Sequence, residues 1–211
     1  MKKFKANIYS QLGASNHVEE ERQKDDFYST DPHAVDCLLE TLEKLNIEIP
    51  DTIIEPSVGM GHIADKFKNI GKKVIGYDII DRGYEGTILQ DFLTLESLET
   101  GGSKSSKMFV ENPPYKLALK FVEKSLNFCS EGEYVCAFLK IQFLESQSRY
   151  EFFDEFPPEY VVIFSKRISC HKDGINQKDS SAMCFAWYIW KKGYNGFPKI
   201  TWTNYDKPSR K

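Results

Sequence analysis

Residues 108–115 read Met-Phe-Val-Glu-Asn-Pro-Pro-Tyr, and this stretch decides how the rest of the chain is interpreted. The apolar run Met108-Phe109-Val110 indicates a buried strand that ends as a loop begins at Asn112-Pro113-Pro114-Tyr115. Two successive prolines fix φ twice and remove two backbone donors, so the turn is stiff and its carbonyls are left to accept hydrogen bonds. An amide side chain and a flat aromatic ring flank the prolines. The turn therefore predicts a site that holds an amino group and stacks on a planar ring; the alternative is a plain strand-ending turn with an exposed tyrosine.

The composition is that of an ordinary globular protein. A length of 211 residues predicts one domain with a sizeable core, and 41% hydrophobic and 28% charged residues fit a soluble chain. No apolar stretch is long enough to span a membrane, and no apolar signal core follows the basic N-terminus. The five cysteines form no CxxC pair, which predicts reduced thiols and neither a disulfide frame nor a zinc site. We therefore expect a cytoplasmic protein.

The positive charge is local, because the net charge is −3. Three basic clusters, Lys166-Arg167, Lys191-Lys192 and the tail 207–211, lie in the second half of the chain. Clusters this short are typical of a solvated face. They also suit a phosphate-contacting patch, since phosphate binding needs local charge and not a high overall pI.

The chain divides into an N-terminal arm (1–26), one domain (27–203) and a basic tail (204–211). Asp31-Pro32 is typical of a helix N-cap followed by proline at the first helical position, and this helix should stop before Pro50. Strands then alternate with helices, which predicts an α/β fold with a mostly parallel, seven-stranded sheet and helices on both faces. The last two strands, around the polar segment 170–181, are expected to form an antiparallel hairpin at one edge. We expect strands at 52–54, 74–77, 87–89, 108–110, 134–139, 160–164 and 184–190, and further helices at 63–70, 117–128 and near 144–153.

Three more motifs fall at predicted strand ends, where sheets of this kind bind ligands. Glu55-Pro56-Ser57-Val58-Gly59-Met60-Gly61 can bring the backbone close to a ligand, although it matches neither a dinucleotide fingerprint nor a phosphate-binding P-loop. Asp78 can accept both hydroxyls of a ribose. Asp91-Phe92 can bind an adenine amino group and cover its ring. A plain strand-to-helix turn and a capping aspartate are the alternatives for the first two motifs.

These motifs, in this order, resemble those of Rossmann-like S-adenosylmethionine-dependent methyltransferases, and most of all the N6-adenine DNA methyltransferases and their phage-encoded relatives. The stretch 26–32 resembles the upstream motif that closes over the methionine end of the cofactor. The resemblance spans roughly residues 26 to 192. It implies S-adenosyl-L-methionine as cofactor. The implied cofactor-binding residues are Tyr28, Thr30, Glu55, Pro56, Ser57, Gly59, Gly61, Asp78, Ile79, Asp91, Phe92 and Asn112, and the implied catalytic residues are Asn112, Pro113, Pro114 and Tyr115.

The resemblance also implies a chemistry. The Asn112 side-chain oxygen and the Pro113 carbonyl would accept the two hydrogens of an adenine N6 amine, and Tyr115 would stack on a flipped base. Candidate phosphate contacts are Lys140, Arg149 and Arg167. The expected partner is DNA, in a bacterial or phage-infected host cell, with no membrane and no metal, and with the protein a monomer or homodimer.

Several alternatives stay open. The chain has no insert for a target-recognition domain, so only the N-terminal arm and the segment 170–181 remain for reading a sequence. An amine in an RNA base, a glutamine amide in a protein, and a cofactor-binding subunit without catalysis all fit the same turn. The tryptophan-rich region 187–202 is either a binding surface or, more in keeping with its pattern, a buried strand face formed by Phe185, Trp187 and Ile189.

Overall fold

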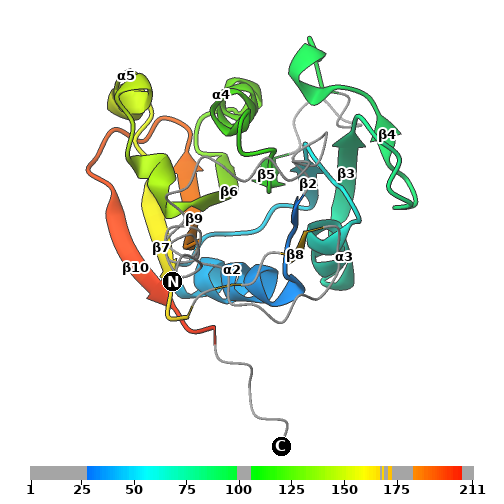
Figure 1. Ribbon diagram of the computed structural model, residues 1–211, viewed down its shortest axis with the longest axis horizontal. Helices are drawn as coiled ribbons and strands as arrows, with labels where there is room; N and C mark the ends of the chain where they lie inside the picture. The colour runs from blue at the N-terminus through cyan, green and yellow to red at the C-terminus, as the bar shows by residue number, and fades with distance from the viewer. Residues whose placement is uncertain (1–27, 99–105, 167, 169–170, 173–182, 206–211) are drawn as a thin grey trace, which may run out of the picture.

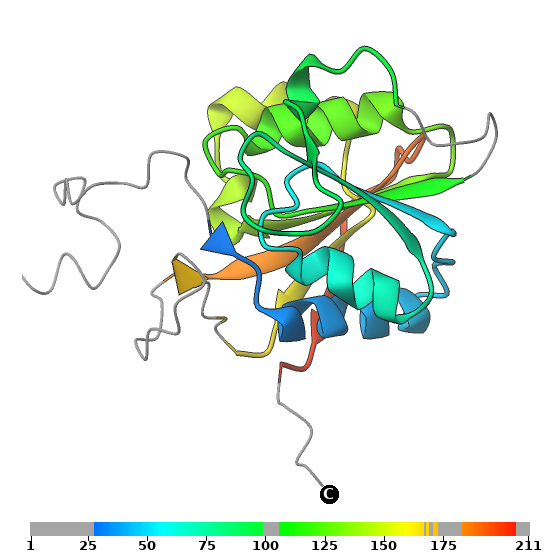
Figure 2. The same cartoon turned by 90° about the vertical axis from the view of Figure 1, so that its right-hand side faces the viewer.

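The computed structural model describes residues 28–98, 106–166, 168, 171–172 and 183–205, and these form an α/β fold in three layers (Figure 1). An eight-stranded sheet lies in the middle, in the order β10-β7-β9-β6-β5-β2-β3-β4. Helices α2 and α3 cover one face and α4 and α5 the other, as the turned view also shows (Figure 2). The helices are α2 (Pro32–Lys44), α3 (His62–Asn69), α4 (Ala118–Phe128) and α5 (Tyr150–Glu155); the strands of the large sheet are β2 (Thr52–Glu55), β3 (Lys73–Asp78), β4 (Ile88–Leu89), β5 (Lys107–Glu111), β6 (Tyr134–Lys140), β7 (Tyr160–Phe164), β9 (Phe185–Lys191) and β10 (Lys199–Thr203).

The first half of the sheet agrees with the prediction from the sequence. Asp31 caps α2 by accepting from the His33 backbone amide at 2.9 Å, and Pro32 takes the first helical position, as predicted. Strands β3, β2, β5 and β6 are parallel neighbours in the sheet. All four residues of β2 are buried, which fits a central strand covered on both faces.

The far side of the sheet differs from the prediction in strand number and position. The pair β7 and β9 is antiparallel, as expected, but β9 is inserted between β6 and β7. An eighth strand, β10, lies parallel to β7 and forms the edge. This strand was missed because its large apolar residues, Ile200 and Trp202, are more than 60% exposed and give no signature of a buried strand.

Strand β9 is held from both layers of helices. The Trp187 indole donates to the Ala34 carbonyl of α2 at 2.8 Å, and the Trp190 indole donates to the Phe156 carbonyl after α5 at 3.0 Å. Phe185, Trp187 and Ile189 are buried in the core beneath α2 and α3. The interpretation of this stretch as a buried strand face is confirmed.

The predicted helix near 144–153 is shorter and irregular. Two 3₁₀ turns, Ile141–Leu144 and Gln147–Arg149, precede α5. The Arg149 guanidinium donates to the backbone carbonyls of Gln142, Phe143 and Glu145. Those carbonyls would otherwise serve a continuous α-helix, so the side chain stabilises the turns in its place.

A second, two-stranded sheet joins two segments far apart in the chain. Strand β1 (Tyr28–Ser29) pairs antiparallel with β8 (His171–Lys172), with Ser29 opposite His171. It lies beside the carboxyl ends of the large sheet, so the start of the domain approaches the predicted ligand site. The predicted arm 1–26, most of the segment 170–181 and the basic cluster 207–211 lie outside the described residues.

Candidate active site

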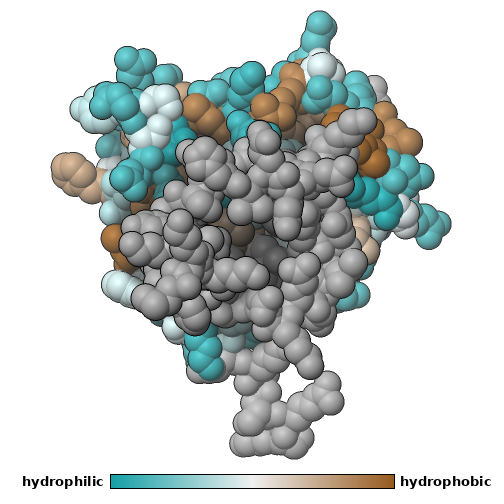
Figure 3. Space-filling view, in the orientation of Figure 1, coloured by the Kyte–Doolittle hydropathy of each residue, from teal (hydrophilic) through white to brown (hydrophobic). Residues whose placement is uncertain are grey.

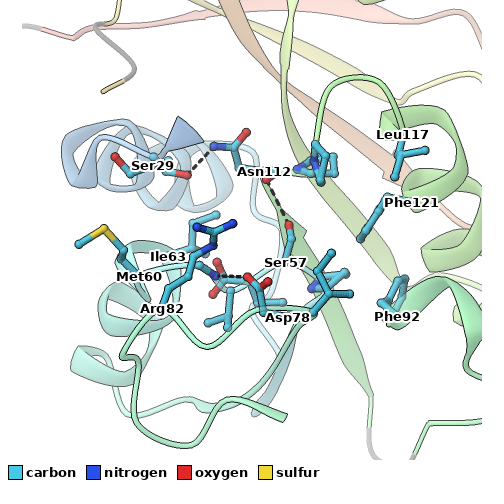
Figure 4. A pocket seen from close by; sticks show the side chains of 18 of the residues that line it. Ser29, Ser57, Met60, Ile63, Asp78, Arg82, Phe92, Asn112, Leu117 and Phe121 are labelled. Carbon is cyan, nitrogen blue, oxygen red and sulfur yellow. Dashed lines mark hydrogen bonds between the residues drawn. The ribbon is translucent and has the colours of Figure 1, made fainter. Parts of the chain in front are cut away.

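A cleft lies at the carboxyl ends of β2, β3 and β5, and its empty volume, including the open solvent at its mouth, is about 900 Å³ (Figure 4). The loop after β1 and the 3₁₀ helix Phe92–Thr94 complete its walls. The structure brings together in this cleft most of the residues proposed from the sequence: Thr30, Glu55, Pro56, Ser57, Gly59, Asp78, Ile79, Asp91, Phe92, Asn112, Pro113, Pro114 and Tyr115. Gly61, Lys140 and Arg149 do not line it, Tyr28 contributes backbone to β1, and Arg167 lies outside the described residues.

The glycine turn after β2 needs its glycines. Gly59 has φ 55° and Gly61 has φ 81°, both in the left-handed region that side chains disfavour. Gly61 also caps α3, and a Cβ there would lie 2.0 Å from the Tyr84 ring. The Val58 amide donates to the Tyr77 carbonyl at 2.8 Å, which ties the turn to β3. The turn is thereby fixed at the floor of the cleft.

Asp78 ends β3 with both carboxylate oxygens engaged by backbone amides. Its Oδ2 accepts from Gly59 N at 2.9 Å, and its Oδ1 accepts from Ile80 N at 3.0 Å. Each carboxylate oxygen has a further acceptor position. The side chain therefore lies fixed in the cleft with capacity for two hydroxyl donors.

Glu55 supplies a buried acceptor beside the glycine turn. The residue is 2% exposed, and within the described residues its Oε2 has no hydrogen-bond partner. Burial raises the pKa of this carboxyl well above its ordinary value, with an opposing contribution from the Ala64 backbone amide. Because buried polar atoms are normally satisfied, this oxygen suits a donor on a bound ligand.

The Asn112 amide is oriented by a contact across 82 positions of the chain. Its Nδ2 donates to Thr30 Oγ1 at 3.0 Å, and its backbone carbonyl accepts from Ser57 Oγ at 3.1 Å (Figure 4). With the amide nitrogen directed at Thr30, Oδ1 is the acceptor end of the side chain. The next carbonyl, that of Pro113, accepts no hydrogen bond from the described residues, whereas the Pro114 carbonyl accepts from Leu117 N at 2.8 Å.

Tyr115 lies between an aromatic ring and a cation. Its ring centroid is 5.8 Å from that of Phe185, and the Lys140 ammonium lies 4.4 Å from the Tyr115 centroid. Lys140 ends β6, so its ammonium stands next to the Asn112 turn even though the residue does not line the cleft. Arg149, in contrast, directs its guanidinium at three backbone carbonyls.

The opposite end of the cleft is aromatic. Phe92 is 1% exposed and stacks on Phe121, with centroids 5.9 Å apart and an interplanar angle of 19°. Asp91 Oδ1 accepts from Leu93 N at 2.9 Å and caps the 3₁₀ helix. Nearby, Ile79 is 63% exposed at the rim, and brown apolar surface is visible on the β3–β4 side of the molecule (Figure 3). This end therefore offers an apolar wall for a flat ring.

Sequence reasoning missed several lining residues, among them the polar residues His62, Arg82 and Gln90. His62 Nδ1 lies 2.8 Å from the Thr30 carbonyl and so fixes the loop that holds Asn112. Arg82 lies in the β3–β4 loop and points into the cleft (Figure 4). Arg82 has no motif around it, and His62 follows the glycine motif directly but was not proposed as a site residue, so the spatial arrangement identifies both.

The described part of the chain has neither a cluster of metal ligands nor a helix suited to a membrane. No three His, Cys, Asp or Glu side chains there are grouped so that they could hold a metal ion. None of the described helices combines the length and apolar character needed to cross a membrane.

Comparison with known proteins finds likeness in fold alone. No protein-family model matches the sequence, and no curated protein matches it significantly. A Listeria monocytogenes protein, described as a candidate class I S-adenosylmethionine-dependent methyltransferase, has a TM-score of 0.58 at 12% identity and covers 94% of this chain and 72% of its own. A candidate RNA methyltransferase from Pyrococcus horikoshii has a TM-score of 0.57 at 14% identity, covering 78% and 87%. The methyltransferase subunit of a type I restriction-modification system from Streptococcus thermophilus has a TM-score of 0.59 at 12% identity, covering 85% and 47%.

These likenesses confirm the predicted fold class. The chain has the Rossmann-like fold of class I methyltransferases, with a mostly parallel sheet and an antiparallel strand near one edge.

Proposed function

We propose that this chain is an S-adenosyl-L-methionine-dependent methyltransferase that modifies the N6 amino group of adenine in DNA. The observation that carries the proposal is the paired acceptors at the end of β5. The Asn112 amide is turned by Thr30 so that Oδ1 accepts, and the adjacent Pro113 carbonyl has no partner among the described residues. Two acceptors on one stiff turn match the two hydrogens of an exocyclic amine.

The residues present fit the cofactor. Asp78 offers two fixed oxygens for ribose hydroxyls, Phe92 and Ile79 give an apolar wall for adenine, and Glu55 keeps a buried acceptor for the ammonium of the methionine part. When bound, the cofactor supplies an electrophilic methyl group on its sulfonium.

The chain's own residues would activate the amine by positioning. An adenine amine is a weak nucleophile because its lone pair is delocalised into the ring. Hydrogen bonds from its two hydrogens to Asn112 Oδ1 and the Pro113 carbonyl would localise that lone pair and direct it toward the cofactor. Ser57 Oγ donates to the Asn112 carbonyl, so this hydrogen bond joins the Asn112 turn to the glycine turn at the floor of the cleft.

A nucleic-acid substrate is supported by the surroundings of Tyr115. The ring offers a stacking surface, and the Lys140 ammonium beside it suits a backbone phosphate. Structures with the same fold include a candidate RNA methyltransferase and a restriction-modification methyltransferase subunit, so an amine in RNA is the second candidate. A glutamine amide in a protein would fit the turn but would not use the cation.

The test is to incubate the protein with methyl-labelled cofactor and, in separate reactions, duplex DNA, single-stranded DNA, RNA and lysate protein. We expect label in DNA. Label in RNA alone would mean that the substrate is RNA and not DNA. Label in protein alone would reject a nucleic-acid substrate. Binding of cofactor without transfer to any of the four substrates would favour a non-catalytic subunit.

A further inference from the structure

Arg82 is the one arginine or lysine side chain among the described residues that line the cleft. It lies in the loop between β3 and β4, and its Nε is buried. Figure 4 shows the guanidinium reaching into the cavity beyond Asp78, toward the side where Ser57 and Asn112 lie. A cation on that side of the cleft would bind an anionic group of a ligand.

The loop that carries Arg82 is fastened to α3. The Tyr84 ring packs over Gly61, where no side chain would fit, and the Lys68 ammonium lies 4.5 Å from the centroid of that ring. Thr87 Oγ1 donates to the Tyr84 carbonyl at 2.7 Å, which closes the loop on itself. These contacts fix the loop that carries Arg82 at the mouth of the cleft.

Two further features make this part of the cleft suitable for a ligand group that carries both an ammonium and a carboxylate. The buried Glu55 carboxyl has an oxygen, Oε2, without a partner among the described residues, which suits an ammonium. Helix α3 begins at His62, and its N-cap residue Gly61 provides no side-chain hydrogen bond; the N-terminus of a helix favours an anion. A guanidinium on one side and a carboxyl on the other is the arrangement that an α-amino acid requires.

We infer that Arg82 binds the α-carboxylate of the cofactor's methionine part and makes the cleft selective for cofactors that carry this group. The inference rests on the proposed function, since it needs S-adenosylmethionine as the ligand. It adds a specificity-determining residue that no sequence motif marks.

The test uses two ligands that differ in the carboxylate. Calorimetry would measure the affinity of the wild-type protein, Arg82→Ala and Arg82→Gln for S-adenosylmethionine and for decarboxylated S-adenosylmethionine. A charge-assisted hydrogen bond corresponds to about 10- to 100-fold in affinity, so both variants should lose about that factor for the first ligand and less than about twofold for the second. Lys72→Ala, which removes a cation at the other end of α3, should change neither affinity.

The outcomes separate the two proposals. If the wild-type protein binds neither ligand, the proposed function fails, and the inference fails with it. If the wild-type protein binds both ligands equally, or if the variants lose both to the same extent, Arg82 does not recognise the carboxylate and only the inference is overturned. Where Arg82→Ala does not fold, Arg82→Gln supplies the comparison, and equal affinity of the wild-type protein for the two ligands overturns the inference without any variant.

Discussion

The two sides of the cleft are built by different means. On the cofactor side, Asp78 and Asp91 are fixed by hydrogen bonds to backbone amides two to nineteen residues away, and the glycine turn is fixed by its own φ angles. On the amine side, the Asn112 amide is fixed by Thr30 across 82 positions, and Tyr115 is bracketed by Phe185 and a lysine. Local backbone rules thus shape one side, while tertiary contacts between side chains shape the other. Substitutions on the cofactor side should therefore lower mainly cofactor affinity, and substitutions on the amine side should lower mainly the rate of methyl transfer.

The largest separation is expected for Asn112→Ala. Loss of one of the two acceptors should lower the rate of methyl transfer by about 100- to 1000-fold, with cofactor affinity within about threefold of wild type. Single-turnover kinetics and calorimetry on the same sample measure the two quantities. Asn127→Ala, at an exposed position of α4, is the matched control. Full turnover by the Asn112 variant would show that the catalytic turn is wrongly assigned.

Behind the amine side, Glu111 should make stability depend on pH. Glu111 is fully buried, with Oε2 accepting from Ser125 Oγ at 3.1 Å, and burial raises its pKa to about 8 from an ordinary value near 4.5. Between these two pH values the folded state keeps a proton that the unfolded state has released, so this residue lowers stability as pH rises through that window.

Glu111→Gln removes this titration. Relative to wild type, its free energy of unfolding should rise by a few kcal/mol between pH 5 and pH 8. Urea unfolding at several pH values measures the difference, with Glu48→Gln at an exposed position as control. A constant difference across the range would mean that Glu111 does not hold a proton in the folded state.

On the cofactor side, Asp78→Ala should give the reverse of the Asn112 result. Without the carboxylate, the ribose loses its acceptors and Gly59 N and Ile80 N lose theirs, so cofactor affinity should fall by about 10- to 100-fold. At saturating cofactor the transfer rate should stay within a few-fold of wild type. Asp154→Ala, on the surface of α5, should leave both unchanged. An unaltered affinity in the Asp78 variant would contradict the ribose assignment.

The smallest effects are expected for Lys140 and Arg149, which the sequence analysis proposed equally as phosphate contacts. Lys140→Ala should reduce the salt dependence of nucleic-acid binding by about one counterion, because its ammonium is placed beside Tyr115. Arg149→Ala should leave that slope unchanged and instead lower the melting temperature by roughly 2–6 °C, because three carbonyls lose their donor. Equal slopes for both variants would remove Lys140 from the substrate side.

The contrast between local backbone rules and tertiary contacts also explains which features could be predicted from the sequence. The capping of α2 by Asp31, the buried strand at 52–54 and the glycine turn follow from local rules, and the structure has all three. Strand β10 could not be found, because its apolar residues face solvent. Arg82 lies in a loop without periodicity, and the contact between Asn112 and Thr30 depends on how β1 and β5 come together in the fold.

The most direct test of the central claim is to identify the methylated atom. DNA treated with the protein and methyl-labelled cofactor would be digested to nucleosides and analysed by mass spectrometry. We predict N6-methyl-2′-deoxyadenosine as the labelled product, and none from the Asn112→Ala variant. Label on a ring nitrogen, on a base without an exocyclic amine, or at equal levels in both proteins would contradict the account of the Asn112–Pro113 turn.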